Sequence, residues 1–130
     1  MELMQPFALW QGLLDGRWSI IGRYDREERQ VLVARENDSA LAKVRALTDR
    51  ERRIIEEAAT GRSNKQVAAE VGLSIGTVSG YLTSALRKMG LRSRAELIVV
   101  GGPSKLNMAD SVSIDHVATP VQVAVGGRND

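Results

Sequence analysis

The clearest pattern in the chain is a series of short amphipathic segments between residues 48 and 100. Each segment opens on a serine or threonine that can cap a helix, and three of the four have Glu or Gln three positions later, which completes a capping box. Apolar residues then recur at helical spacing until a glycine that can end the helix. The pattern predicts four short helices, which start at Thr48, Ser63, Ser74 and Ser93 and stop at Gly61, Gly72, Gly90 and Gly101.

The third predicted helix has two chemically different faces. One face is apolar and is expected to be buried: it carries Ile75, Val78, Leu82, Ala85 and Met89. The opposite face is mostly small and polar: it carries Gly76, Ser79, Gly80, Thr83 and Arg87. Only the short turn 71–74 separates this helix from the preceding one, which is typical of a helix-turn-helix. Such a face can lie close to the floor of a DNA groove while neighbouring cations reach phosphate.

The N-terminal flank predicts a small element of different character. Residues 6–15 form a predicted helix with Phe7, Trp10, Leu13 and Leu14 on one face. Two β-prone runs, 18–24 and 30–35, follow on either side of the charged connection 25–29 and predict a hairpin. The segment 37–46, with Leu41 and Val44 and followed by Leu47, predicts a helix that connects the hairpin to the helices beyond it.

The segment after Pro103 leaves two alternatives open. Short alternating runs at 111–115 and 121–125 predict strands that pair with the N-terminal hairpin or pair across a dimer. The other alternative is a mobile tail. The single histidine, His116, lies between the runs without a second metal ligand nearby, so we expect it to be solvated or hydrogen-bonded.

Composition narrows the possible functions. The chain of 130 residues is 43% hydrophobic and contains no cysteine, which excludes disulfides, thiolate metal sites and a cysteine nucleophile. With a single histidine and without a phosphate-binding loop, we expect no cofactor, no metal and no enzymatic activity. Neither an export signal nor an apolar run of membrane-spanning length is present, so a cytoplasmic protein without membrane association is expected.

Charge is concentrated in the middle of the chain. Residues 48–94 carry nine basic against five acidic groups, whereas residues 1–47 are balanced and residues 95–130 are net acidic. An excess of cations over a helix-turn-helix favours nucleic-acid binding. A compact helical domain with a few extra arginines has the same composition, so charge and periodicity alone leave both interpretations open.

Four separated motifs carry a resemblance to a known family. They are Leu-Thr-Asp-Arg-Glu-Arg at 47–52, Gly-Arg-Ser-Asn-Lys-Gln-Val-Ala at 61–68, Ser-Ile-Gly-Thr-Val at 74–78 and Arg-Lys-Met-Gly-Leu-Arg-Ser-Arg-Ala-Glu-Leu at 87–97. In order and spacing they resemble the DNA-binding domain of LuxR-type (GerE-like) bacterial transcription regulators. The resemblance implies a four-helix DNA-binding domain at 47–100. With the patterns described above, we expect a mainly α chain with a small β element: a helix and hairpin at 1–46 precede this domain, and a C-terminal extension at 101–130 follows it.

The resemblance also implies roles for individual residues. Bases in the major groove of double-stranded DNA would be contacted by Ser79, Gly80 and Thr83. Phosphate would be held by Ser63, Asn64, Lys65, Thr77 and Arg87. The fourth helix would join two copies on an inverted-repeat site through Arg94, Leu97 and Ile98, which makes a homodimer the expected state.

Two departures from the family pattern support an alternative. Ser79 stands where the family commonly has lysine, and Tyr81 stands where it commonly has histidine. Gly76 and Gly80 interrupt the same helix, where each glycine costs about 1 kcal/mol relative to alanine. The alternative is a protein-interaction module that keeps the fold but binds RNA polymerase or another regulator instead of a DNA sequence.

Overall fold

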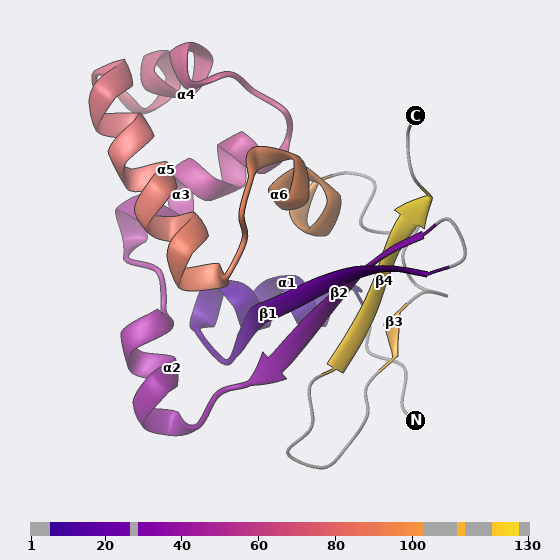
Figure 1. The fold of residues 1–130 in the computed structure, drawn as a ribbon. Helices are drawn as coiled ribbons and strands as arrows, with labels where there is room; N and C mark the ends of the chain where they lie inside the picture. The colour runs from indigo at the N-terminus through magenta and orange to yellow at the C-terminus, as the bar shows by residue number, and fades with distance from the viewer. Residues whose placement is uncertain (1–5, 27–28, 103–111, 114–120, 128–130) are drawn as a thin grey trace.

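The computed structural model describes residues 6–26, 29–102, 112–113 and 121–127. Within these ranges the chain forms six helices and four strands (Figure 1). In chain order they are α1 (Pro6–Asp15), β1 (Trp18–Arg26), β2 (Arg29–Glu36), α2 (Ser39–Arg45), α3 (Asp49–Ala59), α4 (Asn64–Val71), α5 (Ile75–Met89), α6 (Arg94–Gly101), β3 (Val112–Ser113) and β4 (Val121–Gly127). The predicted mainly helical fold with an N-terminal helix and hairpin is confirmed.

The strands form one antiparallel sheet in the order β1-β2-β4-β3. Strand β4 pairs with β2, so a segment from the end of the chain extends the N-terminal hairpin. Of the C-terminal run predicted at 111–115, only Val112–Ser113 is a described strand, and His116 lies outside the described residues. In Figure 1 the sheet lies on one side of the molecule, and α4, α5 and α2 lie on the other.

Among the described residues, one hydrophobic cluster connects the flank to the helices. Leu13 of α1, Leu32 of β2 and Ile54 of α3 belong to one cluster of buried residues. Trp10 lies so close to the end of α6 that a Cβ at Gly101 would collide with its ring. The buried cluster therefore crosses residue 46, and the division into segments 1–46, 47–100 and 101–130 stays a prediction.

The helix caps follow the sequence signals. Both Thr48 and Ser63 form reciprocal capping boxes, with Glu51 and Gln66 respectively. At the start of α6 the box is only half formed, because Ser93 accepts from the Glu96 N–H while the Glu96 carboxylate accepts from Arg92 and Arg23 instead. The predicted capping box at Ser93 is therefore wrong, because the Glu96 carboxylate binds Arg23 of β1 and the Arg92 N–H and not the Ser93 N–H.

Two predicted core residues are at the surface. Phe7 is 56% exposed, because the buried face of α1 begins only at Leu9. Ile75 is 51% exposed, because it is the first residue of α5 and lies about one turn before Val78, where the buried face begins. In both helices the periodicity is correct, but the terminal turn extends past the core.

A buried ion pair fixes the sheet against the helices. Arg23 of β1 contacts Glu96 of α6 through two hydrogen bonds, Nε to Oε2 at 2.7 Å and Nη2 to Oε1 at 2.9 Å. The same guanidinium donates to the carbonyl of Gly90, 3.0 Å away. Strand β1 passes so close to this turn that a Cβ at Gly90 would collide with the Ile20 carbonyl oxygen.

We predict that Gly90→Ala destabilises the fold more than Gly72→Ala. Both glycines end helices in the left-handed conformation, with φ of 80° and 72°, so both substitutions introduce backbone strain of about 1–2 kcal/mol. Only at Gly90 does the new methyl group also meet β1, whereas nothing lies within 4 Å of a Cβ at Gly72. Urea unfolding measures both losses, and equal losses would contradict the close approach of β1.

Candidate DNA-binding surface

Helix α5 is placed with its apolar stripe inward and its polar stripe outward. Val78, Leu82, Ala85 and Met89 are buried, and α5 packs against both α3 and α4. The α5 outer face is fully at the surface: its residues are Gly76, Ser79, Gly80, Thr83 and Arg87, and each is exposed. The predicted base-contacting residues thus lie together on an open face.

A buried carboxylate holds α5 in this orientation. Glu51 of α3 is only 4% exposed, and its carboxylate accepts from Ser84 Oγ at 2.7 Å and from Lys88 Nζ at 2.7 Å. It also accepts from the Thr48 backbone N–H at 2.9 Å, which closes the capping box. Ser84 and Lys88 are one helical turn apart on α5, so together they fix the rotation of that helix about its axis.

These contacts determine the protonation of Glu51. Burial acts to raise its pKa, but the hydrogen bonds from Lys88, Thr48 and Ser84, together with the charge of Lys88, outweigh it. The pKa falls from the ordinary 4.5 to about 2. The carboxylate is therefore ionised at neutral pH.

The predicted phosphate-binding residues lie at two helix starts and at the end of α5. Ser63 caps α4, and Ser74 caps α5 and donates to Thr77 Oγ1 at 2.8 Å. The first backbone N–H groups of each helix lack an intrahelical partner and can bind an anion. Lys65 and Arg87 are exposed, and neither forms an ion pair within the described part of the chain.

Shallow depressions border the α5 outer face on both sides. One, of about 410 Å³, lies between the start of α3 and α5 and is lined by Thr48, Glu51, Thr77, Gly80, Tyr81 and Ser84. The other, of about 340 Å³, is lined by Thr83, Leu86, Arg87, Leu91 and Arg92. Arg92 has no role in the sequence-based assignment, although it lies inside the last of the four motifs.

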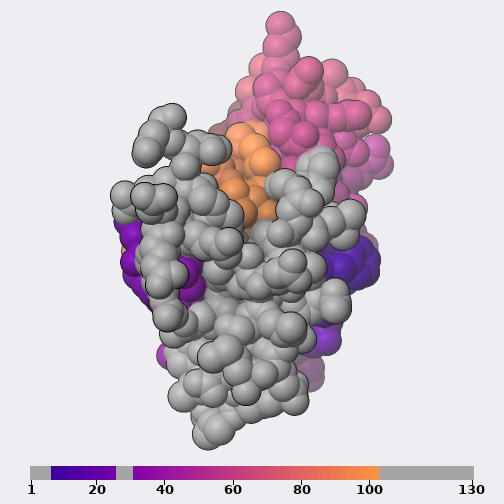
Figure 2. All heavy atoms as spheres, turned by 90° about the vertical axis from the view of Figure 1, so that its right-hand side faces the viewer, coloured from indigo at the N-terminus to yellow at the C-terminus, as the bar shows by residue number. Residues whose placement is uncertain are grey.

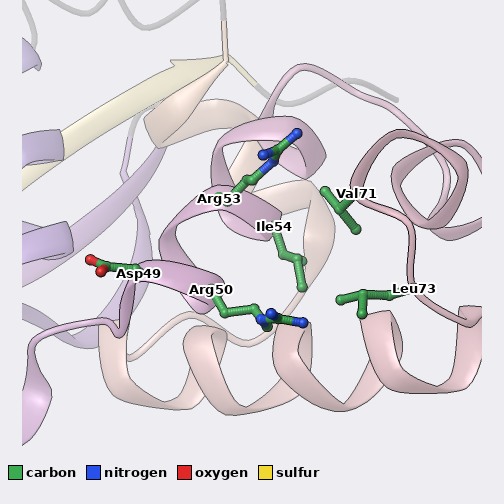
Figure 3. Close-up of a pocket in the computed structure, with 6 residues that line it drawn as sticks. All are labelled: Asp49, Arg50, Arg53, Ile54, Val71 and Leu73. Atoms are coloured by element: carbon green, nitrogen blue, oxygen red, sulfur yellow. The ribbon is translucent and has the colours of Figure 1, made fainter.

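A separate pocket of about 250 Å³ lies between α3 and the turn from α4 to α5 (Figure 3). Ile54, Val71 and Leu73 supply apolar lining, and Arg50 and Arg53 line the pocket as well. Asp49 also belongs to the lining, but Figure 3 shows its carboxylate directed away from both guanidinium groups. No sequence pattern indicated this pocket, because its walls come from separate helices.

The residues predicted for a dimer contact differ in accessibility. Leu97 is 0% exposed and belongs to the core of the chain itself. Arg94 is half-buried and donates to the Arg62 carbonyl at 2.6 Å and to the Asn64 side chain, which ties α6 to the start of α4. Ile98 is half-buried. Figure 2 shows a patch of α6 at the surface of the face that lies to the right in Figure 1.

The described ranges contain neither a metal-binding cluster nor a membrane-spanning helix. These ranges contain no group of three or more His, Asp or Glu residues arranged to hold a metal ion. None of the helices described there has the length and apolar character needed to cross a bilayer.

Comparison with known proteins agrees with the architecture of α3 to α6. Residues 45–100 match the family model of bacterial regulatory proteins of the luxR family. The chain is 32% identical over 53 residues to the spore germination protein GerE of Bacillus subtilis, an alignment that covers 41% of this chain and 72% of GerE.

Longer relatives align over a smaller share of their length. The chain is 38% identical over 52 residues to the transcriptional regulatory protein DesR of Bacillus subtilis, covering 40% of this chain and 26% of DesR. It is 35% identical over 96 residues to nodulation protein W of Bradyrhizobium diazoefficiens, covering 74% of this chain and 40% of that protein. The chain therefore spans about a quarter to two fifths of these longer relatives.

We predict that Glu51→Gln lowers the free energy of unfolding at pH 7 by about 3 kcal/mol. This is the free energy that corresponds to the lowering of the Glu51 pKa from 4.5 to about 2. Because the pKa is lower in the folded chain, the stabilisation is complete above about pH 4.5 and is lost as the pH falls toward 2. Unfolding measured across this pH range should show a weaker acid dependence in the variant.

Glu56→Gln is the matched control, since Glu56 is an exposed carboxylate on the same helix. It should change stability by less than about 0.5 kcal/mol. Equal losses for both variants would mean that Glu51 does not anchor α5.

Proposed function

Because the chain belongs to the LuxR family of DNA-binding bacterial regulators, we propose that it occupies a short inverted-repeat site in double-stranded DNA as a homodimer in the cytoplasm. The observation that carries this proposal is the α5 outer face. It is open, it is fixed from behind by Glu51, and α5 contains no acidic residue. A surface of this kind suits a polyanion with a groove.

Base contact is proposed for Ser79, Gly80 and Thr83. The hydroxyls of Ser79 and Thr83 can donate to or accept from base edges in the major groove. A Cβ at Gly80 would meet nothing within 4 Å, so the fold itself does not require glycine there. Its absence of a side chain instead lets the helix backbone approach the bases closely.

Phosphate contact is proposed for the residues that flank this face. The start of α4 carries Ser63, Asn64 and Lys65, and the first turn of α5 carries Thr77. Phosphate can bind at both helix starts. Arg87 lies at the other end of the α5 outer face. Their separation along the surface suits contact with both strands that border one groove.

The dimer contact is proposed for the accessible part of α6. Arg94 and Ile98 are partly accessible to solvent. Leu97 is fully buried, so it is not part of the proposed contact. Two α6 helices that meet about a two-fold axis would place two α5 outer faces on one side of a duplex.

A second candidate function is docking of a partner protein such as RNA polymerase or another regulator. The pocket in Figure 3 favours it, because an apolar wall beside two arginines suits an acidic segment with one apolar anchor. Neither Arg50 nor Arg53 has an ion-pair partner among the residues described. Protein binding without any DNA association at low salt would favour this function over the first.

We predict different effects for Lys65→Glu and Thr83→Ala on DNA binding. Lys65→Glu should weaken binding to all duplexes alike and reduce the slope of log affinity against log salt by about 1, because it removes a phosphate contact. Thr83→Ala should change the ranking of duplexes, because it removes a base contact. The measurement is fluorescence anisotropy on random and selected duplexes at several salt concentrations.

Arg35→Glu serves as the charge control, since Arg35 is exposed on β2 of the sheet. It should leave both the affinity and the ranking nearly unchanged. If Lys65→Glu changed the ranking and Thr83→Ala did not, the two assigned roles would be reversed.

A further inference from the structure

Helix α2 lies at the C-terminal end of α5. Arg45 Nη1 donates to the Arg87 carbonyl at 3.1 Å, which joins the last turn of α2 to the last residue of the α5 outer face. Seven-residue α2 lies almost wholly ahead of the region that matches the luxR family model, which begins at residue 45. Helix α2 therefore belongs to the N-terminal flank and not to the matched domain.

The C-terminal end of α2 is fixed against the end of α1. Its Ala42 carbonyl lies where a Cβ at Gly16 would collide with it, so α2 packs directly on the end of α1. Just after α2, the Leu47 N–H donates to the Leu14 carbonyl at 3.0 Å. Since α2 is anchored to the core in this way, its cations are held in place relative to α5.

Three cations meet at this junction, and the nearby carboxylate of Asp15 is paired with Arg52 and Arg17 instead. The last turn of α2 carries Lys43 and Arg45, and its neighbour Arg87 is also cationic. None of the three forms an ion pair with a residue described in the structure. The acidic cap of α2, Asp38, stands at the opposite end of the helix. Like charges held together cost stability in the free protein, and an anionic ligand removes that cost.

The junction also lies on the side of the molecule that would face DNA. In Figure 1, α4, α5 and α2 follow one another along the side opposite the sheet. The contact between Arg45 and Arg87 makes the surface continuous from α5 to α2. A duplex seated on the α5 outer face would therefore continue over the end of α2.

We propose that α2 is a second DNA contact, in which Lys43 and Arg45 bind backbone phosphates beyond the end of α5 that carries Arg87. This inference rests on the proposed function of α5. Because phosphate contacts carry no base identity, α2 raises affinity for every sequence and does not choose among them. Leu41 and Val44 of the same helix are 40% and 69% exposed, so they can pack on deoxyribose.

The test is the double variant Lys43→Gln/Arg45→Gln in the full chain, titrated onto labelled random and selected duplexes by fluorescence anisotropy over a range of salt. Losing two phosphate contacts should reduce the salt slope by about 2 and weaken binding about equally on both duplexes. The single variant Lys43→Gln should reduce the slope by about 1. Because Lys43→Gln keeps the hydrogen bond between Arg45 and the Arg87 carbonyl, it tests the inference even if the double variant disturbs the fold.

The matched control for Lys43→Gln is Arg35→Gln, which removes one exposed charge from β2 of the sheet and should leave the slope unchanged. If the unmodified chain binds no duplex, the proposed function fails and this inference fails with it. If the unmodified chain binds but both α2 variants keep its slope, only the inference is overturned. The inference is also overturned if both α2 variants keep the salt slope and Leu41→Ser/Val44→Ser changes the oligomeric mass in solution. In that case α2 would be a protein interface.

Discussion

The orientation of α5 depends on one buried carboxylate. Glu51 is ionised and almost without solvent, so each of its hydrogen bonds replaces one that water would supply. One donor is the Thr48 N–H at the start of α3, and the other two are Ser84 and Lys88, one turn apart on α5. A rotation of α5 would break the hydrogen bonds from Ser84 and Lys88 together. The apolar stripe decides which side of α5 is buried, and Glu51 fixes the angle at which the opposite side is presented.

A second ion pair extends this control to the rest of the chain. Arg23 and Glu96 connect β1 to α6, and Gly90 allows β1 to pack directly on the turn that follows α5. The sheet therefore supports the turn that follows α5, as Glu51 supports the last two turns of the helix. This arrangement explains why the flank shares a core with the helix-turn-helix, and it places α2 next to Arg87. It also leaves only part of α6 accessible to a second copy.

Local features of the fold could be predicted from the sequence, whereas long-range ones could not. Caps at Thr48, Ser63 and Ser74 depend on residues three positions away, so the sequence contains the whole signal. The Glu51 capping box was visible for the same reason, but its contacts with α5 were not, because they join positions more than 30 residues apart. The pairing of β4 with β2 stayed open between two alternatives until the sheet order was known. The α5 outer face followed from periodicity, whereas the pocket beside α3 required the packing of separate helices.

The most direct test of the central claim is an amide NMR titration of the labelled chain with a duplex selected from a random pool. The claim is that the surface held outward by Glu51 is the surface that meets DNA. We expect the signals of Ser79, Gly80 and Thr83 to shift on binding, while those of β1 and β2 stay in place. A titration that moved the sheet signals and left those of α5 unchanged would contradict the account.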